Sequence, residues 1–182
     1  MEPVKTVIRE ASSERDYEAF ARLIGEYVAW MRTRYGTDTQ FVCDVLDTQS
    51  LSRELADLST RYGAPDGRAL LAVSGDEVRA CGAYRRLDDG ACEMKRVFVP
   101  GRFRATGLGR ALCNALIASA REEGFRFMRL DTGRLFTEAI AMYRSMGFRE
   151  RAAYYACPAN LAASLLFMEL SLEGGGAGAA PR

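Results

Sequence analysis

The chain has 182 residues, enough for one domain with a sizeable buried core. Its hydrophobic content of 48% and charged content of 27% are ordinary for a globular protein, and its net charge of +1 predicts no general attraction to nucleic acid or to a membrane surface. No stretch approaches the roughly 20 apolar residues that span a bilayer, and the N-terminus lacks the pattern of a signal peptide. We therefore expect a cytoplasmic protein, monomeric or homodimeric, with neither a nucleic-acid nor a membrane partner.

The absence of histidine and the pattern of the cysteines exclude several kinds of chemistry. Without histidine there is no Ser-His or Cys-His nucleophile pair and no histidine metal ligand, so a general base must be a carboxylate, a tyrosine, a lysine, a cysteine or a relayed water. The cysteines are odd in number, widely spaced and without a CxxC pair, which argues against a disulfide framework and against a zinc site. We expect reduced cysteines that mostly pack as small hydrophobes, and these are Cys43, Cys81, Cys92, Cys113 and Cys157.

The first third of the chain has the residue patterns of one strand and two helices. The expected elements are a strand over 4–9, an amphipathic helix that begins after Ser12 or Ser13 and ends at Gly36, an ordered loop over 37–48 and a helix over 51–62. In the second helix, Leu51, Leu55 and Leu58 lie on one side and predict its buried face.

The rest of the chain begins with three strands joined by tight turns at 74–76 and 88–90 and then alternates helices and strands. The expected strands are 69–73, 78–86, 92–99, 125–131, 148–155 and 165–172, and the expected helices are one from Leu108 to a cap at Gly124 and one over 135–146. The strand over 125–131 should lie parallel to the one over 92–99. This order predicts a mixed α/β (α+β) fold in one domain, 1–172, followed by a disordered tail, 173–182.

The stretch 92–124 runs from a predicted strand through a basic glycine loop into a predicted helix, and it reads CEMKRVFVPGRFRATGLGRALCNALIASAREEG. A glycine loop at a helix N-terminus is suited to binding phosphate. The dinucleotide motif G-x-G-x-x-G is incomplete, because Leu112 stands where the third glycine belongs. A P-loop is excluded, because no Gly-Lys-Ser/Thr follows the glycines.

The motif that does match is R-x-x-G-x-G/A, at Arg104, Gly107 and Gly109. With the later segments AIAMYRSMGF, YY and FMEL, it makes the chain over about 69–172 resemble the GCN5-related N-acetyltransferases, the GNAT family. The resemblance implies the acyl-CoA N-acyltransferase fold, with a mostly antiparallel sheet of about six or seven strands, splayed between the fourth and fifth strands and flanked by helices on both faces. It also implies transfer of an acetyl group from acetyl-CoA to a primary amine, by direct attack in a ternary complex and without a metal.

The resemblance assigns the cofactor contacts to this same stretch. The pantetheine arm would pair with the backbone of Val97, Phe98 and Val99, and an N–H of Val97 or Phe98 would polarise the thioester carbonyl. The phosphates would bind the loop backbone, where glycines allow close approach and the helix dipole adds a positive field. The loop residues are Arg104, Ala105, Thr106, Gly107, Leu108, Gly109 and Arg110.

Tyr143 is the candidate acid. It stands in the pattern Ala139-x-x-x-Tyr143-x-x-x-Gly147-Phe148, and the resemblance implies that it hydrogen-bonds the coenzyme A sulfur and protonates the departing thiolate. The alternative is a core tyrosine on a helix face. The family often has an asparagine seven residues before this tyrosine, where the chain has Phe136, so that cofactor contact is not expected.

Glu93 is the candidate base, acting through a water, and the alternative is an acid paired with Lys95 or Arg96. Strict alternation along the strand predicts that Glu93, Lys95, Val97 and Val99 share one face, opposite Met94, Arg96 and Phe98.

The acceptor is the part that the sequence defines least. Asp131, at the end of a predicted strand, would orient an amine or cap the following helix. Segments 36–47 and 156–164 should decide whether the acceptor is a small molecule or a peptide, and neither contains a motif that we can assign. Aromatic residues expected on the acceptor side are Trp30, Tyr84, Tyr154 and Tyr155. The alternative function is a catalytically silent acyl-CoA-binding sensor or assembly module with the same fold.

Overall fold

The computed structural model describes residues 5–36, 51–87 and 90–173, so the predicted loop over 37–48, residues 88–89 of the predicted turn and the tail from 174 lie outside the described residues. The strands form one seven-stranded sheet in the order β1-β2-β3-β4-β5-β7-β6, in which β4 and β5 are parallel and the other neighbours are antiparallel. They are β1 (Val7–Glu10), β2 (Gly67–Ser74), β3 (Glu77–Arg86), β4 (Ala91–Phe98), β5 (Phe127–Gly133), β6 (Arg149–Arg151) and β7 (Leu165–Ser171). This arrangement confirms the predicted mixed, mostly antiparallel sheet.

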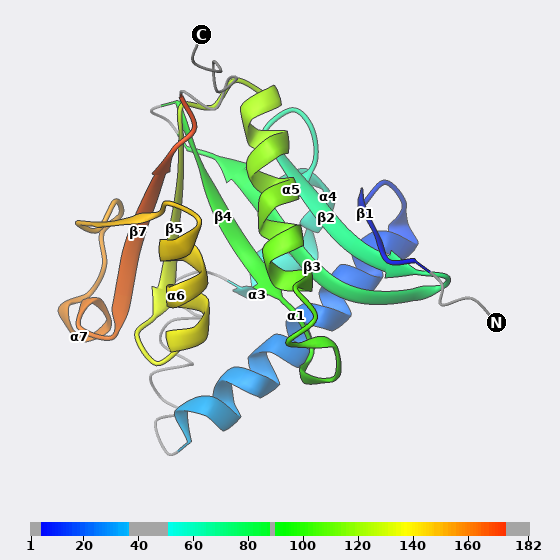
Figure 1. Cartoon of the computed structure of the whole chain (residues 1–182), viewed down its shortest axis with the longest axis horizontal. Coiled ribbons are helices and arrows are strands. Elements are labelled where there is room, and N and C mark those ends of the chain that lie inside the picture. Colours follow the sequence, from blue (N-terminus) through cyan, green and yellow to red (C-terminus); the bar gives the residue numbers. More distant parts are fainter. Residues whose placement is uncertain (1–4, 37–50, 88–89, 174–182) are drawn as a thin grey trace, which may run out of the picture.

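Helices cover both faces of the sheet (Figure 1). They are α1 (Glu14–Tyr35), α3 (Leu51–Ala56), α4 (Leu58–Tyr62), the 3-10 turn η1 (Gly101–Phe103), α5 (Leu108–Glu122), α6 (Thr137–Ser145) and α7 (Ala159–Ala162). Within the described ranges, no helix is both long and apolar enough to cross a bilayer.

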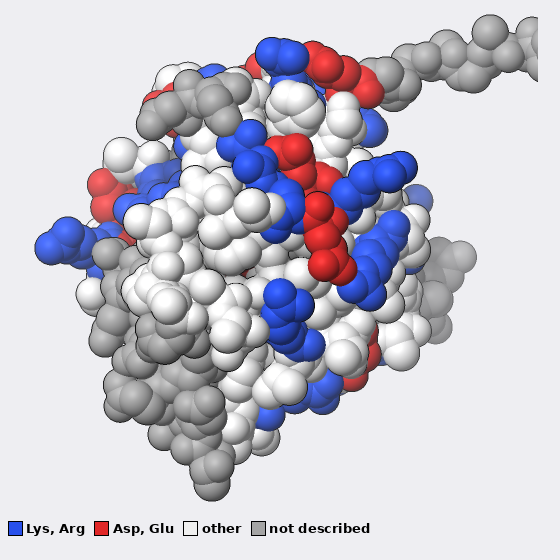
Figure 2. Space-filling view, turned by 90° about the vertical axis from the view of Figure 1, so that its left-hand side faces the viewer, with Lys and Arg blue, Asp and Glu red and all other residues white. Residues whose placement is uncertain are grey.

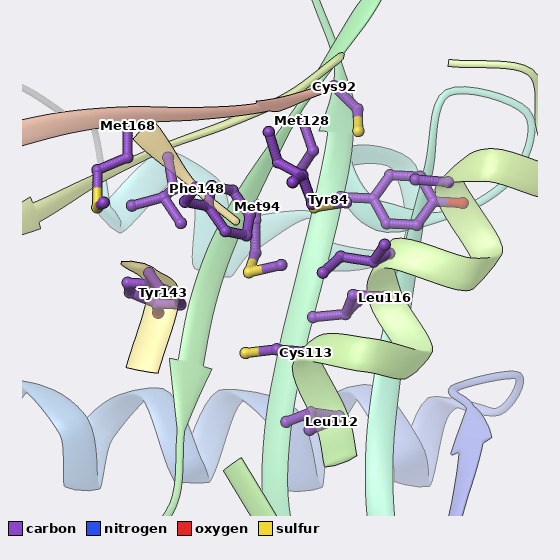
Figure 3. Close-up of a cluster of buried hydrophobic side chains, with 14 of the residues drawn as sticks. Tyr84, Cys92, Met94, Leu112, Cys113, Leu116, Met128, Tyr143, Phe148 and Met168 are labelled. Carbon is purple, nitrogen blue, oxygen red and sulfur yellow. The ribbon is translucent and has the colours of Figure 1, made fainter. Parts of the chain in front are cut away.

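The sheet has a large hydrophobic core on each face, and a third, smaller cluster contains Met31, Phe136, Leu161, Leu165 and Phe167. The α5-side core lies beneath α5 and α6 (Figure 3), and the α1-side core lies beneath α1 and α4. Because side chains alternate along a strand, Leu70 and Ala72 of β2 enter the α5-side core, whereas Ala69 and Leu71 enter the α1-side core.

Helix α1 begins and ends where its sequence predicts. The Ser13 hydroxyl accepts a hydrogen bond from the Asp16 N–H at 3.2 Å, and the Asp16 carboxylate accepts one from the Ser13 N–H at 3.2 Å, which completes a capping box. The same carboxylate accepts two hydrogen bonds from Arg9, at 3.0 and 2.6 Å, and so joins β1 to the start of α1. Gly36 ends the helix with φ 59°, in the left-handed region.

The predicted helix over 51–62 is in fact two short helices. Asp57 interrupts it, because its carboxylate accepts a hydrogen bond from the Thr60 N–H and caps α4. The predicted apolar face is also wrong at Leu55, which is 38% exposed, whereas Glu54 beside it is 1% exposed. The buried side therefore includes a carboxylate, and apolar periodicity could not show this.

The C-terminal strand β6 is shorter than the predicted strand over 148–155. Its pairing with β7 ends at Arg151, opposite Phe167. Tyr154 and Tyr155 then pack edge-on against the Phe167 ring, with centroids 5.6 and 5.3 Å away. Helix α7 was not predicted, because a helix of 4 residues is too short to show a period.

Strands β4 and β5 stay together for a short distance and then separate (Figure 1). Their pairing runs from Ala91 opposite Phe127 to Glu93 opposite Arg129, and the rest of each strand has no partner in the other. This separation confirms the predicted splay between the fourth and fifth strands.

An irregularity in β4 follows the point of separation. Lys95 and Phe98 both pair with β3, but the two residues between them face Gly82 alone, so β4 contains a β-bulge. Arg96, in the bulge, has φ 58°, a conformation that costs a non-glycine residue about 1–2 kcal/mol.

The bulge changes which face each later side chain of β4 occupies. Val97 and Val99 pack against the α5-side core, and Phe98 belongs to the α1-side core. The prediction that Val97 and Val99 share the face of Glu93 is therefore wrong, because the bulge at Arg96 shifts the alternation by one residue.

The α5-side core depends on close packing of α5 against the sheet, and Leu116 is fully buried within it. Leu116→Ala should destabilise the fold by about 2–5 kcal/mol and lower the melting temperature by roughly 5–15 °C, because removal of this side chain leaves a cavity between α5 and the sheet. Leu135→Ala is the matched control. Leu135 is 49% exposed, so the melting temperature of this variant should be close to that of the wild type. Differential scanning calorimetry measures both, and equal losses would contradict this account of the core.

Candidate active site

A pocket with a volume of about 510 Å³ lies where β4 and β5 separate. Residues from α1, β4, the loop before α5, the first turn of α5, β5 and α6 line it. The predicted site residues among them are Val97, Phe98, Val99, Arg104, Ala105, Gly109 and Tyr143. The predicted residues that do not line it are Glu93, Thr106, Gly107, Leu108 and Arg110.

The glycine loop has the backbone of an anion site. Ala105 and Gly107 both have positive φ, 60° and 80°, and Gly107 stands immediately before α5. Alternation of such conformations turns successive N–H groups toward one side of a loop, and the first N–H groups of a helix have no acceptor within the helix. The loop and the start of α5 therefore present N–H groups and the positive end of a helix dipole.

Side chains brace this loop from within and from α6. The Arg104 Nε donates to the Val99 carbonyl at 2.9 Å, and its guanidinium lies 4.3 Å from the Trp30 ring centroid. The Thr106 hydroxyl donates to the Phe103 carbonyl at 2.8 Å. Arg110 donates to the Ser145 hydroxyl of α6 at 2.6 Å, so the two helices beside the pocket are tied together.

Tyr143 lies on α6 at the boundary between the α5-side core and the pocket (Figure 3). Its ring meets the edge of Phe148 at 5.6 Å, and the residue is 8% exposed. Burial raises the pKa of the Tyr143 hydroxyl well above its ordinary value, so the group stays protonated. No hydrogen bond joins this hydroxyl to another described part of the chain, which leaves it able to donate a proton.

Glu93 is 1% exposed and engaged by several donors. Arg85 donates to Oε2 at 2.8 Å, Tyr154 donates to Oε1 at 2.8 Å, and Lys95 donates to Oε1 at 3.3 Å. Burial acts to raise the pKa of the Glu93 carboxyl, but the charges of Lys95 and Arg85 and the Tyr154 hydrogen bond outweigh it and hold this pKa below its usual value. Glu93 therefore has the environment of an ionised structural acid.

A second carboxylate, Asp131 of β5, does line the pocket. Lys95 donates to its Oδ1 at 3.3 Å, and Lys95 also lines the pocket. Asp131 does not cap α6, since the residue before that helix is Phe136 and no side chain caps it. The capping alternative for Asp131 is therefore wrong, and the carboxylate belongs to the pocket.

An aromatic wall closes the α1 side of the pocket, formed by Tyr27, Trp30, Phe98 and Phe136. Trp30 packs on Phe136 at 4.9 Å and Tyr27 packs on Phe98 at 5.5 Å between ring centroids. Sequence reasoning identified Trp30 and missed Tyr27 in this role, because helical spacing in α1 predicts burial and does not distinguish a core from a pocket.

The other tyrosines expected near the acceptor lie elsewhere. Tyr84 is buried in the α5-side core, where its hydroxyl lies 2.9 Å from that of Ser119, so its expected role is wrong. Tyr154 contacts Glu93, Arg129 and Arg151, and neither Tyr154 nor Tyr155 lines the pocket.

The face that carries β7 and α7 shows basic and acidic side chains side by side (Figure 2).

The described cysteines are free thiols, and three of them, Cys81, Cys92 and Cys113, are buried. Burial raises the pKa of Cys92 and of Cys113 to about 12, which disfavours the nucleophilic thiolate. Cys43 lies outside the described residues. Within the described ranges, no group of three or more cysteine, aspartate or glutamate side chains is arranged to hold a metal ion.

Comparison with known proteins identifies the family. The family model described as the acetyltransferase (GNAT) family matches residues 37–148. An uncharacterized N-acetyltransferase of Schizosaccharomyces pombe is 28% identical over 175 residues, which are 95% of this chain and 99% of that protein.

Solved structures share the fold. A GNAT-family acetyltransferase of Staphylococcus aureus has a TM-score of 0.69 at 18% identity, over 93% of this chain and 100% of the other. The PaiA N-acetyltransferase of Thermoplasma acidophilum, in complex with coenzyme A, has a TM-score of 0.68 at 16% identity, over 92% of this chain and 99% of the other. These matches agree with the splayed sheet and with the predicted fold class, and the chain belongs to the GNAT acetyltransferase family.

Proposed function

We propose that the protein transfers an acetyl group from acetyl-CoA to a primary amine while both are bound. The observation that carries this proposal is the pocket between β4 and β5, which has a positive-φ glycine loop at one end and a protonated tyrosine in its wall. The coenzyme A complex of the similar Thermoplasma acidophilum protein supports the choice of donor.

The loop before α5 would bind the phosphates of the donor, and the free edge of β4 would bind its pantetheine arm. Backbone N–H groups of Gly107, Leu108 and Gly109 supply donors at the helix N-terminus. Beyond Glu93, β4 does not use β5 as a partner, so the amide-bearing arm has strand backbone to pair with at Val97 to Val99.

Chemistry would take place beside the bulge of β4. The amine nitrogen attacks the thioester carbon, an N–H of Val97 or Phe98 stabilises the negative charge on the carbonyl oxygen, and the carbon–sulfur bond breaks. Tyr143 donates its proton to the departing sulfur and is reprotonated from water, which also takes up the proton that the attacking nitrogen loses. The products are the N-acetylated acceptor and free coenzyme A.

The acceptor amine would lie on the α1 side, between Asp131 and the aromatic wall. Asp131 occupies the sheet face opposite the core that holds Tyr143, so the pocket offers a carboxylate to an ammonium on one side and a proton donor on the other. Glu93 could be a base or a paired structural acid. In this proposal it has the structural role, because it anchors Lys95 and Arg85. The alternative of a silent acyl-CoA sensor is disfavoured by the available Tyr143 hydroxyl.

The donor site makes the first prediction of this function. Saturating acetyl-CoA should raise the melting temperature by roughly 5–10 °C, whereas NAD(P) should not, because the dinucleotide motif is incomplete. Gly107→Ala should weaken acetyl-CoA binding about tenfold, since alanine disfavours φ 80° by about 1–2 kcal/mol. Gly101→Ala, in the same loop with open space and no positive φ, is the control and should bind as wild type. A thermal shift with NAD(P) but none with acetyl-CoA would overturn the proposal.

The acid role of Tyr143 makes the second prediction. With the best amine from a panel, assayed by release of free thiol, Tyr143→Phe should lower kcat about 100-fold and leave the acetyl-CoA Kd unchanged. Because the pKa of Tyr143 is raised well above 10, wild-type kcat should show no loss from tyrosine ionisation up to about pH 9. Tyr84→Phe, in the same core but outside the pocket, is the control. Unchanged turnover in Tyr143→Phe would remove this tyrosine as the acid.

The structural role of Glu93 makes the third prediction. Its folded-state pKa is lowered, so its ionised form contributes stability above the unfolded pKa of about 4.3, and this contribution is lost as the pH falls from there through the folded pKa. Glu93→Gln should lower the free energy of unfolding at pH 7 by roughly 3 kcal/mol and make its decline below pH 4.5 less steep. Urea unfolding at several pH values measures both.

The activity of the same variant tests the other possible role of Glu93. As an anchor, Glu93→Gln should keep the wild-type shape of the kcat/KM profile against pH. If the variant instead lacks the decrease of kcat/KM at low pH that the wild type shows, and its stability is unchanged, Glu93 is the base.

A further inference from the structure

We propose that Glu54 and Arg96 form a positioning pair. Glu54 holds the β4 bulge in the conformation in which a backbone N–H of Val97 or Phe98 polarises the thioester carbonyl of acetyl-CoA. This inference rests on the proposed function, because it concerns the same thioester site. Glu54 does not line the pocket, so it acts through Arg96.

The bulge needs something to hold it. Arg96 has φ 58°, and side chains other than glycine disfavour this region. Such a conformation persists only where the surrounding structure determines it. It lies one residue before Val97, whose backbone is one of the two candidate donors to the carbonyl oxygen.

Glu54 provides a rigid anchor on the α1 side. Arg96 donates from Nε to Oε1 at 2.7 Å and from a terminal nitrogen to Oε2 at 2.8 Å. Two parallel hydrogen bonds fix the plane of the guanidinium as well as its position. Tyr62, which is fully buried against Phe20, donates to Oε1 at 2.9 Å and so fixes the carboxylate in turn.

Packing holds the bulge from the α5 side as well. A Cβ added at Gly82, opposite the bulge, would meet Val97 Cγ2 at 3.2 Å and Leu116 Cδ1 at 3.0 Å, so this glycine allows Val97 to pack closely. The bulge is thus held on both faces of the sheet. Arg96 is ion-paired on the α1 side, and Val97 is packed on the α5 side.

Stability gives no sufficient reason for the pair. The Arg96 side chain is 4% exposed and that of Glu54 is 1% exposed, and replacing buried ion pairs by apolar side chains of similar volume is often neutral or stabilising. What apolar side chains cannot reproduce is the fixed orientation of a side chain on a residue with positive φ. The pair is therefore suited to positioning the backbone.

Infrared spectroscopy of bound acetyl-CoA, with ¹³C in the thioester carbonyl, tests the proposal without an acceptor. In the wild type the carbonyl band should lie at lower frequency than in free acetyl-CoA, because a hydrogen bond polarises it. In Glu54→Gln, and in the double variant Glu54→Leu with Arg96→Met, at least half of this shift should be lost. The acetyl-CoA Kd should stay within threefold, and kcat with the panel amine should fall at least tenfold.

Asp16→Asn is the matched control. Asp16 is also a largely buried carboxylate in a two-bond pair with an arginine, but it lies outside the pocket, so its variant should keep the wild-type band. The double variant keeps the test valid if Glu54→Gln does not fold, because its apolar pair retains the packing volume. A folded double variant with the wild-type band and kcat would overturn the inference, as would a wild type that binds acetyl-CoA without a band shift. A wild type that does not bind acetyl-CoA would instead overturn the proposed function.

Discussion

The separation of β4 from β5 is the constraint on which the rest of the site depends. After Glu93 and Arg129, the two strands stop pairing with each other, although both continue. Backbone N–H and C=O groups in the interior require partners, so this opening is suited to a ligand that itself carries amides. The pocket, the edge of β4 that does not pair with β5 and the approach to the glycine loop all follow from it, and α6 and α1 form the walls of the pocket on the two faces of the sheet.

The sheet also separates two chemical environments that an acyl transfer needs. On the α5 side, Tyr143 shares a core with aliphatic and sulfur-containing side chains, which keeps its hydroxyl neutral. On the α1 side charges gather, and Lys95 pairs with Glu93 of its own strand and with Asp131 of β5. A pocket that reaches both faces therefore combines a neutral proton donor, Tyr143, with a carboxylate, Asp131.

Local patterns predicted most of the fold, and non-local contacts account for what they missed. The caps of α1 and the turn at Gly107 depend on neighbouring residues, so their sequence signals were sufficient. The bulge at Arg96 and the burial of Glu54 depend on each other across 42 positions of the sequence. A residue-by-residue reading treats each as an ordinary charged residue, because neither alternation nor helical spacing carries information about a distant ion pair.

The contacts of Glu93 support one of the two roles that its spacing in the sequence leaves open. A general base is most effective when its pKa lies near the working pH, and a lowered pKa moves a carboxylate away from that condition. Its oxygens already accept from Arg85, Lys95 and Tyr154, so a water that carries an amine proton would have to displace one of them. The same bonds hold Lys95 at the pocket beside Asp131. In the proposed function, Glu93 therefore contributes by keeping its partners in place and not by taking a proton.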